Sequence, residues 1–123
     1  EKHRKYTFNY EASKAFFSSS DLLKEPGKQM RTVWDIPNNK TKEELMFGTH
    51  PTQKPLRVAE RILTIAGVKG GKLLVPFAGS GTEMIAGLEY GMNVYGYEIN
   101  PDFYELACKR LKYYSDKSTR LLF

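Results

Sequence analysis

The sequence predicts an α/β fold, in which helices cover both faces of an open and mostly parallel sheet, and this chain supplies only part of it. Beyond residue 50, segments of helical and strand-like character alternate in the order helix, strand, glycine loop, helix, strand, helix. Such alternation is typical of a parallel sheet. The chain has 123 residues, of which 41% are hydrophobic and 27% charged, and this length and composition suit one compact folded domain.

The first predicted helix leads directly into the first predicted strand. Pro55 suits the first position of a helix, and apolar residues recur at helical spacing from Leu56 to Ala66 before Gly67 ends the helix. After a glycine turn, the run KLLVPF at residues 72–77 is short and mostly apolar. This pattern is typical of a buried strand.

A glycine-rich loop joins this strand to the second predicted helix. The loop is AGSG at residues 78–81, and residues 82–90 return to helical spacing. Residues 93–99 (NVYGYEI) predict a second strand. Asn100 and Pro101 then supply an N-cap and a first helical residue for the last helix.

Residues 1–49 differ in texture from residues 50–123. Prolines and glycines interrupt residues 1–49, which predicts an irregular segment. Within it, residues 6–10 alternate aromatic and polar side chains, which favours an exposed strand. Residues 1–42 carry nine Lys or Arg and five Asp or Glu, interleaved with aromatic residues.

This basic N-terminal segment has two interpretations. Basic and aromatic side chains together can follow a phosphate backbone and stack on bases, and a net charge of +5 is compatible with a nucleic-acid partner. The aromatic residues can equally pack on a neighbouring domain. The candidate DNA-binding residues are Lys2, Arg4, Lys5, Lys28 and Arg31.

Composition also excludes several classes of protein. No apolar run approaches the roughly 20 residues of a membrane-spanning helix, and residues 1–5 lack the apolar core of a secretory signal. Cys108 is the only cysteine, so an intramolecular disulfide is impossible and a reducing cytoplasm is the expected location. Because His, Cys and acidic residues show no metal-ligand spacing, we predict that there is no metal.

The glycine loop and the acidic residue after it point to a nucleoside ligand. Gly79 and Gly81 allow a sharp turn and a close approach of the backbone to a ligand. Glu98 follows Gly79 by 19 residues, near the spacing of about 20 at which a carboxylate meets ribose hydroxyls. The third glycine of the dinucleotide fingerprint and the Gly-Lys-Ser/Thr of a phosphate loop are both missing, which leaves a nucleoside cofactor without a pyrophosphate. Alternatively, the glycines form a purely structural turn and Glu98 is a solvated carboxylate.

Three motifs resemble those of the amino-group DNA methyltransferases that use S-adenosylmethionine. Residues 72–82 (KLLVPFAGSGT) resemble their cofactor loop, residues 50–55 (HPTQKP) the block before it, and residues 97–100 (YEIN) their ribose-binding strand end. Weaker similarity extends the match over residues 27–114. The resemblance implies a Rossmann-like methyltransferase fold. It further implies that residues 1–49 end a target-recognition region and residues 50–123 form the S-adenosylmethionine-binding half.

The resemblance also implies roles for individual residues. Thr52, Gln53 and Lys54 would lie near the methionine end of the cofactor, where Lys54 suits its carboxylate. Glu98 would bind the ribose hydroxyls, and Ile99 would lie against the adenine. The residues that would surround the methionine and ribose are Phe77, Ala78, Gly79, Ser80, Gly81 and Thr82. In the alternative interpretation, Lys54 is solvated and Ile99 belongs to the core. His50 is predicted to be a local hydrogen bonder rather than a catalyst.

The sequence departs from the family pattern in two places. Val75 stands where members usually have Asp, and it cannot accept a hydrogen bond from an ammonium group, so we expect weakened cofactor binding. The family's catalytic motif, two adjacent prolines followed by an aromatic residue, is missing because no two of the six prolines are adjacent. The chain therefore looks like the C-terminal half of a permuted enzyme, in which the catalytic and recognition regions precede the cofactor loop.

The resulting prediction is a site-specific DNA methyltransferase that acts on N6 of adenine and needs a complementary N-terminal catalytic half. Duplex DNA and a restriction endonuclease system are the expected partners. One alternative is a remnant that binds DNA or a partner subunit without cofactor. Another is an RNA or protein methyltransferase built on the same cofactor fold.

Overall fold

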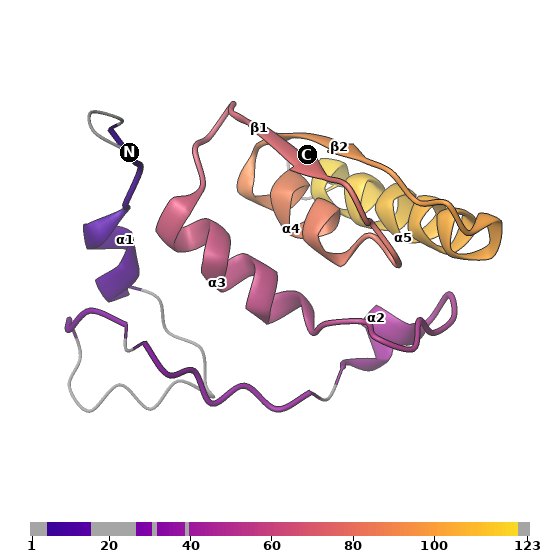
Figure 1. The fold of residues 1–123 in the computed structure, drawn as a ribbon, viewed down its shortest axis with the longest axis horizontal. Helices are drawn as coiled ribbons and strands as arrows, with labels where there is room; N and C mark the ends of the chain where they lie inside the picture. The colour runs from indigo at the N-terminus through magenta and orange to yellow at the C-terminus, as the bar shows by residue number, and fades with distance from the viewer. Residues whose placement is uncertain (1–4, 16–26, 31, 39, 121–123) are drawn as a thin grey trace.

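A computed structural model describes residues 5–15, 27–30, 32–38 and 40–120, and its arrangement is α/β as predicted (Figure 1). The elements in chain order are α1 (Tyr10–Ala15), α2 (Lys42–Leu45), α3 (Leu56–Ala66), β1 (Lys72–Val75), α4 (Thr82–Tyr90), β2 (Asn93–Gly96) and α5 (Pro101–Arg120). In these described ranges, no helix is both long and apolar enough to cross a membrane.

β1 and β2 form a parallel pair connected through α4, as the alternating pattern predicts. Their register runs from Lys72 opposite Asn93 to Val75 opposite Gly96. Both strands end earlier than the sequence predicts, at residues 75 and 96 instead of 77 and 99. Pro76 has no N–H to donate to a ladder, and the chain turns there into the glycine loop.

α4 packs against the sheet through a glycine. Leu73 and Val94 face Gly87, where a Cβ would lie 2.6 Å from a side-chain carbon of each. Beside this contact, α3 packs on α4 through a buried cluster of Ala59, Leu63 and Ala86. The absence of a side chain at residue 87 therefore sets how closely the helix approaches both strands.

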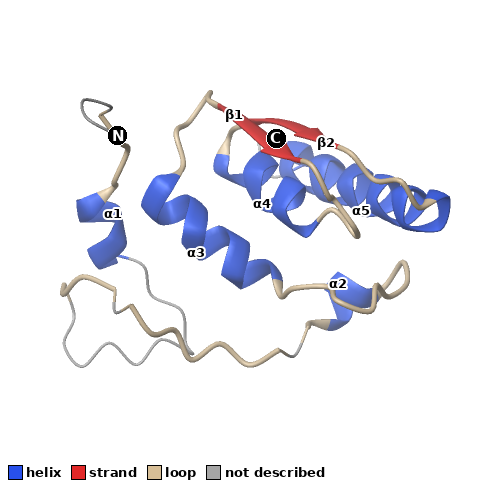
Figure 2. Cartoon of the chain, viewed as in Figure 1, coloured by secondary structure: helices blue, strands red, loops and turns tan. Residues whose placement is uncertain are grey.

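The described helices leave one face of the sheet open. α3, α4 and α5 all lie on the same side of β1 and β2 (Figure 2). On the other side, Leu74 and Tyr95 are large, adjacent in register and exposed. The described residues therefore form only part of the predicted α/β fold, with one face of the two-stranded sheet uncovered, as the prediction of an incomplete sheet requires.

The predicted strand at residues 6–10 does not form. Residues 5–9 have no regular structure, and α1 begins at Tyr10. Asn9 instead binds the end of α3: its backbone N–H donates to the carbonyl of Ile65 (2.7 Å). Its side-chain amide also donates to the carbonyls of Thr64 (3.1 Å) and Gly67 (2.9 Å). These last carbonyls of a helix lack intrahelical partners, and satisfying them holds the segment in place without strand pairing.

The segment before residue 50 also contains α2, which the sequence analysis missed. Thr41 and Glu44 form a capping box, in which each side chain accepts the other residue's backbone N–H. The second oxygen of Glu44 accepts the N–H of Leu56, the first residue of α3 (2.6 Å). One buried carboxylate thus caps the N-termini of α2 and α3 and joins the two regions.

We predict that Gly87→Ala destabilises the fold. The added methyl group would overlap Leu73 and Val94, and such overpacking costs about 1–3 kcal/mol. This exceeds the gain of about 1 kcal/mol from the better helix propensity of alanine. Urea unfolding followed by circular dichroism measures the difference, with Lys112→Ala at an exposed position of α5 as the control. Unchanged stability of Gly87→Ala would contradict the close packing.

Candidate functional site

The loops that follow β1 and β2 lie side by side and are joined by Glu98. The backbone N–H of Ala78 donates to the carbonyl of Tyr97 (2.8 Å). One oxygen of Glu98 accepts the N–H of Gly79 (2.8 Å), and the other accepts the N–H of Asn100 (2.8 Å). We call this arrangement the Glu98 bridge. It fixes the glycine loop against the second strand's continuation.

The Glu98 bridge favours the ionised carboxylate. The N–H groups of Asn100 and then Gly79 are the largest causes that lower the pKa of Glu98 below its ordinary value of 4.5. A carboxylate that accepts backbone N–H groups is stabilised in its charged form. Glu98 is therefore an anion throughout the neutral range.

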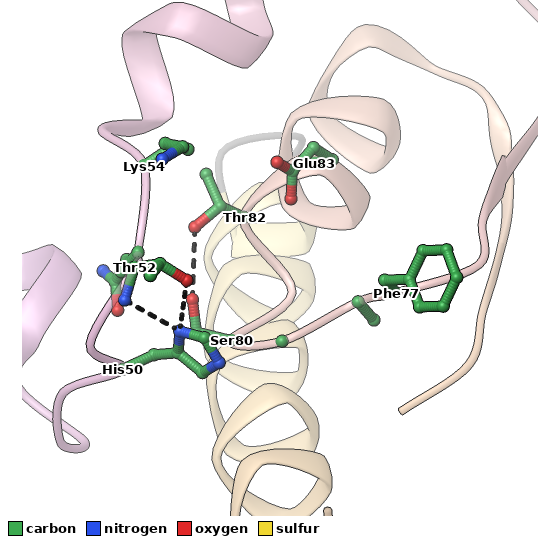
Figure 3. Close-up of a pocket in the computed structure, with 10 residues that line it drawn as sticks. His50, Thr52, Lys54, Phe77, Ser80, Thr82 and Glu83 are labelled. Carbon is green, nitrogen blue, oxygen red and sulfur yellow. Dashed lines mark hydrogen bonds between the residues drawn. The ribbon is translucent and has the colours of Figure 1, made fainter. Parts of the chain in front are cut away.

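A polar pocket of about 180 Å³ lies on one side of the glycine loop (Figure 3). It brings together most of the residues that the resemblance implicated, although HPTQKP and the loop come from distant parts of the sequence. Its lining residues are His50, Thr52, Gln53, Lys54, Phe77, Ala78, Gly79, Ser80, Thr82 and Glu83. Gly81 is not among them, because it is buried against α5.

The two loop glycines are required by backbone conformation and by space. Gly79 has φ +52° and Gly81 has φ +76°, values that favour glycine. A Cβ on Gly79 would lie 3.3 Å from the ring of His50, and one on Gly81 would lie 3.2 Å from the methyl group of Ala107. Gly79 thus allows the loop to pack closely against the HPTQKP block, and Gly81 allows it to pack closely against α5.

His50 acts as a local hydrogen bonder, as predicted. Its Nδ1 accepts the backbone N–H of Thr52 (3.2 Å), and its ring lies 4.1 Å from the ring centroid of Phe103. These contacts hold the turn that directs Thr52 and Lys54 to the pocket.

The pocket offers both acceptors and donors. Gln53 is buried, and its amide donates to the carbonyl of Glu44 (3.1 Å). Its oxygen Oε1 has no hydrogen-bond partner in the described ranges. Glu83, in the first turn of α4, adds a carboxylate that the sequence analysis did not assign to the site. In Figure 3, Thr82 lies between Lys54 and Glu83.

An apolar hollow of about 300 Å³ lies on the other side of the loop. Its lining residues are Pro76, Phe77, Tyr97, Glu98 and Ile99. Phe77 and Ile99 are 92% and 99% exposed, so the alternative that Ile99 is ordinary core is wrong. Since Phe77 lines both the polar pocket and the apolar hollow, the two are neighbours.

Arg110 of α5 supports the loop from within the protein, and the sequence analysis gave it no role. It is 0% exposed. Its Nη1 donates to the carbonyl of Ser80 (2.5 Å) and to the hydroxyl of Thr82 (3.1 Å). Burial lowers its pKa. The sequence does indicate that Arg110 faces the interior of the protein. It shares a helix face with Ala107 and Tyr114, three residues before and four after it.

The remaining predicted residues that the structure describes lie outside both hollows. Val75 is buried at the end of β1 and lines neither. Lys5 and Lys28 are exposed, and Lys2, Arg4 and Arg31 lie outside the described residues. DNA binding by these five side chains stays a prediction, as does the domain boundary at residue 49.

Comparisons with known proteins find one family. A family model described as DNA methylase, for N6 and N4 methyltransferases, matches residues 1–109. The type II methyltransferase M2.DpnII of Streptococcus pneumoniae is 39% identical over 94 residues, which cover 75% of this chain and 35% of that protein. M2.LlaDCHI of Lactococcus lactis subsp. cremoris is 34% identical over 111 residues, covering 90% of this chain and 38% of that protein.

A comparison of structures finds the M1.HpyAVI–SAM complex, with 38% identity and a TM-score of 0.48 over 51% of this chain and 31% of that one. The chain spans somewhat more than a third of the length of the curated relatives it matches.

We predict that Glu98→Gln loosens the Glu98 bridge. The amide has one acceptor oxygen where the carboxylate has two, so the N–H of Gly79 or of Asn100 loses its partner. We expect faster hydrogen exchange at these two amides and a lower melting temperature. Asp102→Asn, which neutralises an exposed carboxylate four residues further on, is the control.

The effect of Glu98→Gln depends on pH in a defined direction. Because the folded-state pKa of Glu98 is lowered, its contribution to stability is fully present above the ordinary value of 4.5 and is lost as the pH falls through the lowered value. The difference in melting temperature between the two proteins should therefore be constant near neutral pH and shrink in acid. A difference that grows in acid would contradict the Glu98 bridge.

Proposed function

The chain belongs to the DNA methylase family, and we propose that it supplies the S-adenosylmethionine-binding half of a site-specific DNA methyltransferase. The proposed acceptor is N6 of adenine in duplex DNA, an assignment that rests on sequence resemblance. The observation that carries the proposal is the Glu98 bridge, with a polar pocket on one side of the glycine loop and an apolar hollow on the other.

The donor set of the polar pocket fits the methionine end of this cofactor. Lys54 and the hydroxyl of Thr82 suit a carboxylate, and the first N–H groups of α4 add further donors. Glu83 and the unpartnered Oε1 of Gln53 suit an ammonium group. These two acceptors offset the Val75 substitution, because they provide the negative potential that Val75 cannot.

The apolar hollow fits the adenosine end. Glu98 accepts two backbone N–H groups, and a carboxylate has about four acceptor positions. The remaining positions can accept the two hydroxyls of a ribose. Phe77 and Ile99 offer apolar area for a purine ring. Polar pocket and apolar hollow, about 180 and about 300 Å³, together fall in the range of about 300–1,000 Å³ that is typical of small-molecule sites.

In the proposed reaction this chain holds the methyl donor and fixes its orientation. Bound S-adenosylmethionine supplies an electrophilic methyl group on a sulfonium. The loop and the HPTQKP block would align that group, since alignment contributes much of the acceleration in such transfers. The target base has to leave the duplex stack to reach the site. The residues that receive its amine belong to the Pro-Pro-aromatic motif, which these 123 residues do not contain.

A complementary catalytic half would extend the sheet at its edge and cover its open face. Leu74 and Tyr95 are exposed on that face, and Phe77, Tyr97 and Ile99 are exposed beyond the strand ends. A two-stranded sheet needs further strands for stability. We propose that the catalytic half supplies them through an interface on the order of 2,000 Å² or more.

The basic N-terminal segment would contact duplex DNA. The enzyme would act in the cytoplasm, paired with a restriction endonuclease.

A second candidate is a remnant that binds DNA or a partner without cofactor. The missing catalytic motif and Val75 favour it. The polar pocket opposes it, because the Oε1 of Gln53 is buried without a partner in the described ranges and offers an acceptor to a ligand. Cofactor binding therefore separates the two functions.

We predict that the chain binds S-adenosylmethionine and that Glu83→Gln weakens this binding about fivefold to tenfold, since one charge-assisted hydrogen bond is lost at an exposed position. Isothermal titration calorimetry measures the affinity. Glu105→Gln, an exposed carboxylate on α5 that pairs with Lys109, is the matched control and should leave it unchanged. Absence of any heat of binding would favour the remnant.

We also predict that methyl transfer requires the catalytic half. Labelled S-adenosylmethionine should methylate duplex DNA only when the chain is combined with a polypeptide that carries the Pro-Pro-aromatic motif. Analysis of the modified nucleoside identifies the base, and N6-methyladenine is the expected product. Transfer by this chain alone would contradict the need for the second half.

A further inference from the structure

Arg110 carries a buried positive charge directly beneath the polar pocket. It is 0% exposed, and its Nε and Nη2 have no hydrogen-bond partner in the part of the chain that the structure describes. Its Nη1 is the atom that makes contacts, with the carbonyl of Ser80 and the hydroxyl of Thr82. A buried cation of this kind is costly to the fold unless it is paired, and here the described residues give it hydrogen bonds through Nη1 alone.

The contact with Thr82 determines what that side chain offers to the pocket. A guanidinium only donates hydrogen bonds, so the oxygen of Thr82 is the acceptor in this pair. The hydroxyl hydrogen is therefore directed elsewhere. Ser80 Oγ lies 3.4 Å from Thr82 Oγ1, and either hydroxyl can donate to the other. Whichever does, one hydroxyl hydrogen of the pair remains for a ligand in the pocket that both residues line.

Arg110 also fixes the turn on which both hydroxyls lie. Its bond to the carbonyl of Ser80 holds that residue, while Gly81 packs closely on Ala107, one helical turn before Arg110. The loop is thus attached to α5 at two adjacent points. The positive charge of Arg110 makes the hydroxyl of Thr82 a better hydrogen-bond donor and raises the electrostatic potential at the pocket wall.

We propose that Arg110 is a positioning residue that acts through Ser80 and Thr82 to make this wall of the polar pocket selective for a carboxylate. The inference rests on the proposed function, because the carboxylate is that of S-adenosylmethionine. Arg110 does not line the pocket, so its action on the ligand is indirect.

The test compares S-adenosylmethionine with its decarboxylated form, which keeps the adenosine, the sulfonium and the amine. Affinities are measured by calorimetry on the full chain. Arg110→Met should weaken S-adenosylmethionine about tenfold or more and the decarboxylated form less than about threefold. Arg110→Lys should restore part of the lost affinity, since an ammonium can still donate to Thr82. Lys109→Met removes the neighbouring exposed charge of α5 and should change neither affinity.

Thr82→Val provides a second route that leaves Arg110 in place and serves if Arg110→Met does not fold. It should produce the same carboxylate-dependent loss, and the two substitutions together should lose little more than either alone.

Three outcomes would overturn the inference. If Arg110→Met loses the same affinity for both ligands, Arg110 has a purely structural role. Thr82→Val decides the point in the same way if Arg110→Met does not fold. Additive losses would show that it does not act through Thr82. If the unaltered chain binds neither ligand, the proposed function fails and this inference fails with it.

Discussion

The site depends on one carboxylate that binds two loops at once. Parallel strands end at the same edge of a sheet, and the register of Val75 opposite Gly96 brings the two following loops together. Without a further contact, these irregular segments would separate beyond the last ladder bonds. The Glu98 bridge closes that edge by accepting one N–H from each loop. Because the bridge needs an anion, the carboxylate of Glu98 provides both the geometry of the two loops and the negative charge beside the apolar hollow.

The surrounding elements each constrain a different part of the glycine loop. The HPTQKP block approaches Gly79 through the ring of His50, and α5 approaches Gly81 through Ala107. α4 begins at the end of the loop and is held to the sheet through Gly87. A side chain at any of these three glycines would push one neighbour away. The loop is therefore fixed from three directions, which is what a preorganised binding site requires.

The sequence predicts the regular elements well where periodicity and end signals agree. α4 lies between Gly81 and Gly91, both with positive φ, and its bounds match the prediction at residues 82–90. Asn100 caps α5 through its side-chain oxygen, which accepts the N–H groups of Asp102 and Phe103. Residues 6–10 mislead because their alternating pattern has no sheet edge to pair with, and Asn9 binds the end of α3 instead.

Residues whose role depends on tertiary contacts could not be assigned from the sequence. Arg110 lies in a helix rich in charged residues, and only packing against the loop makes it a buried donor. Glu83 follows the loop motif without belonging to it, and the position of α4 brings it to the polar pocket. Gln53 was expected at the site, but the contact that holds its side chain was not. Its amide donates to the carbonyl of Glu44, which belongs to the unpredicted helix α2.

Under the proposed function, the arrangement of charge around the polar pocket would offset the absence of a carboxylate at Val75. A carboxylate at the end of β1 is one way to attract an ammonium group, but the requirement is a negative potential in the pocket rather than a particular position. Glu83 provides it from the first turn of α4, where a carboxylate also interacts favourably with the helix dipole. Arg110 lies beneath the loop and provides the opposite charge. The pocket is thus polarised between these two residues, which suits the zwitterionic methionine end of the proposed cofactor.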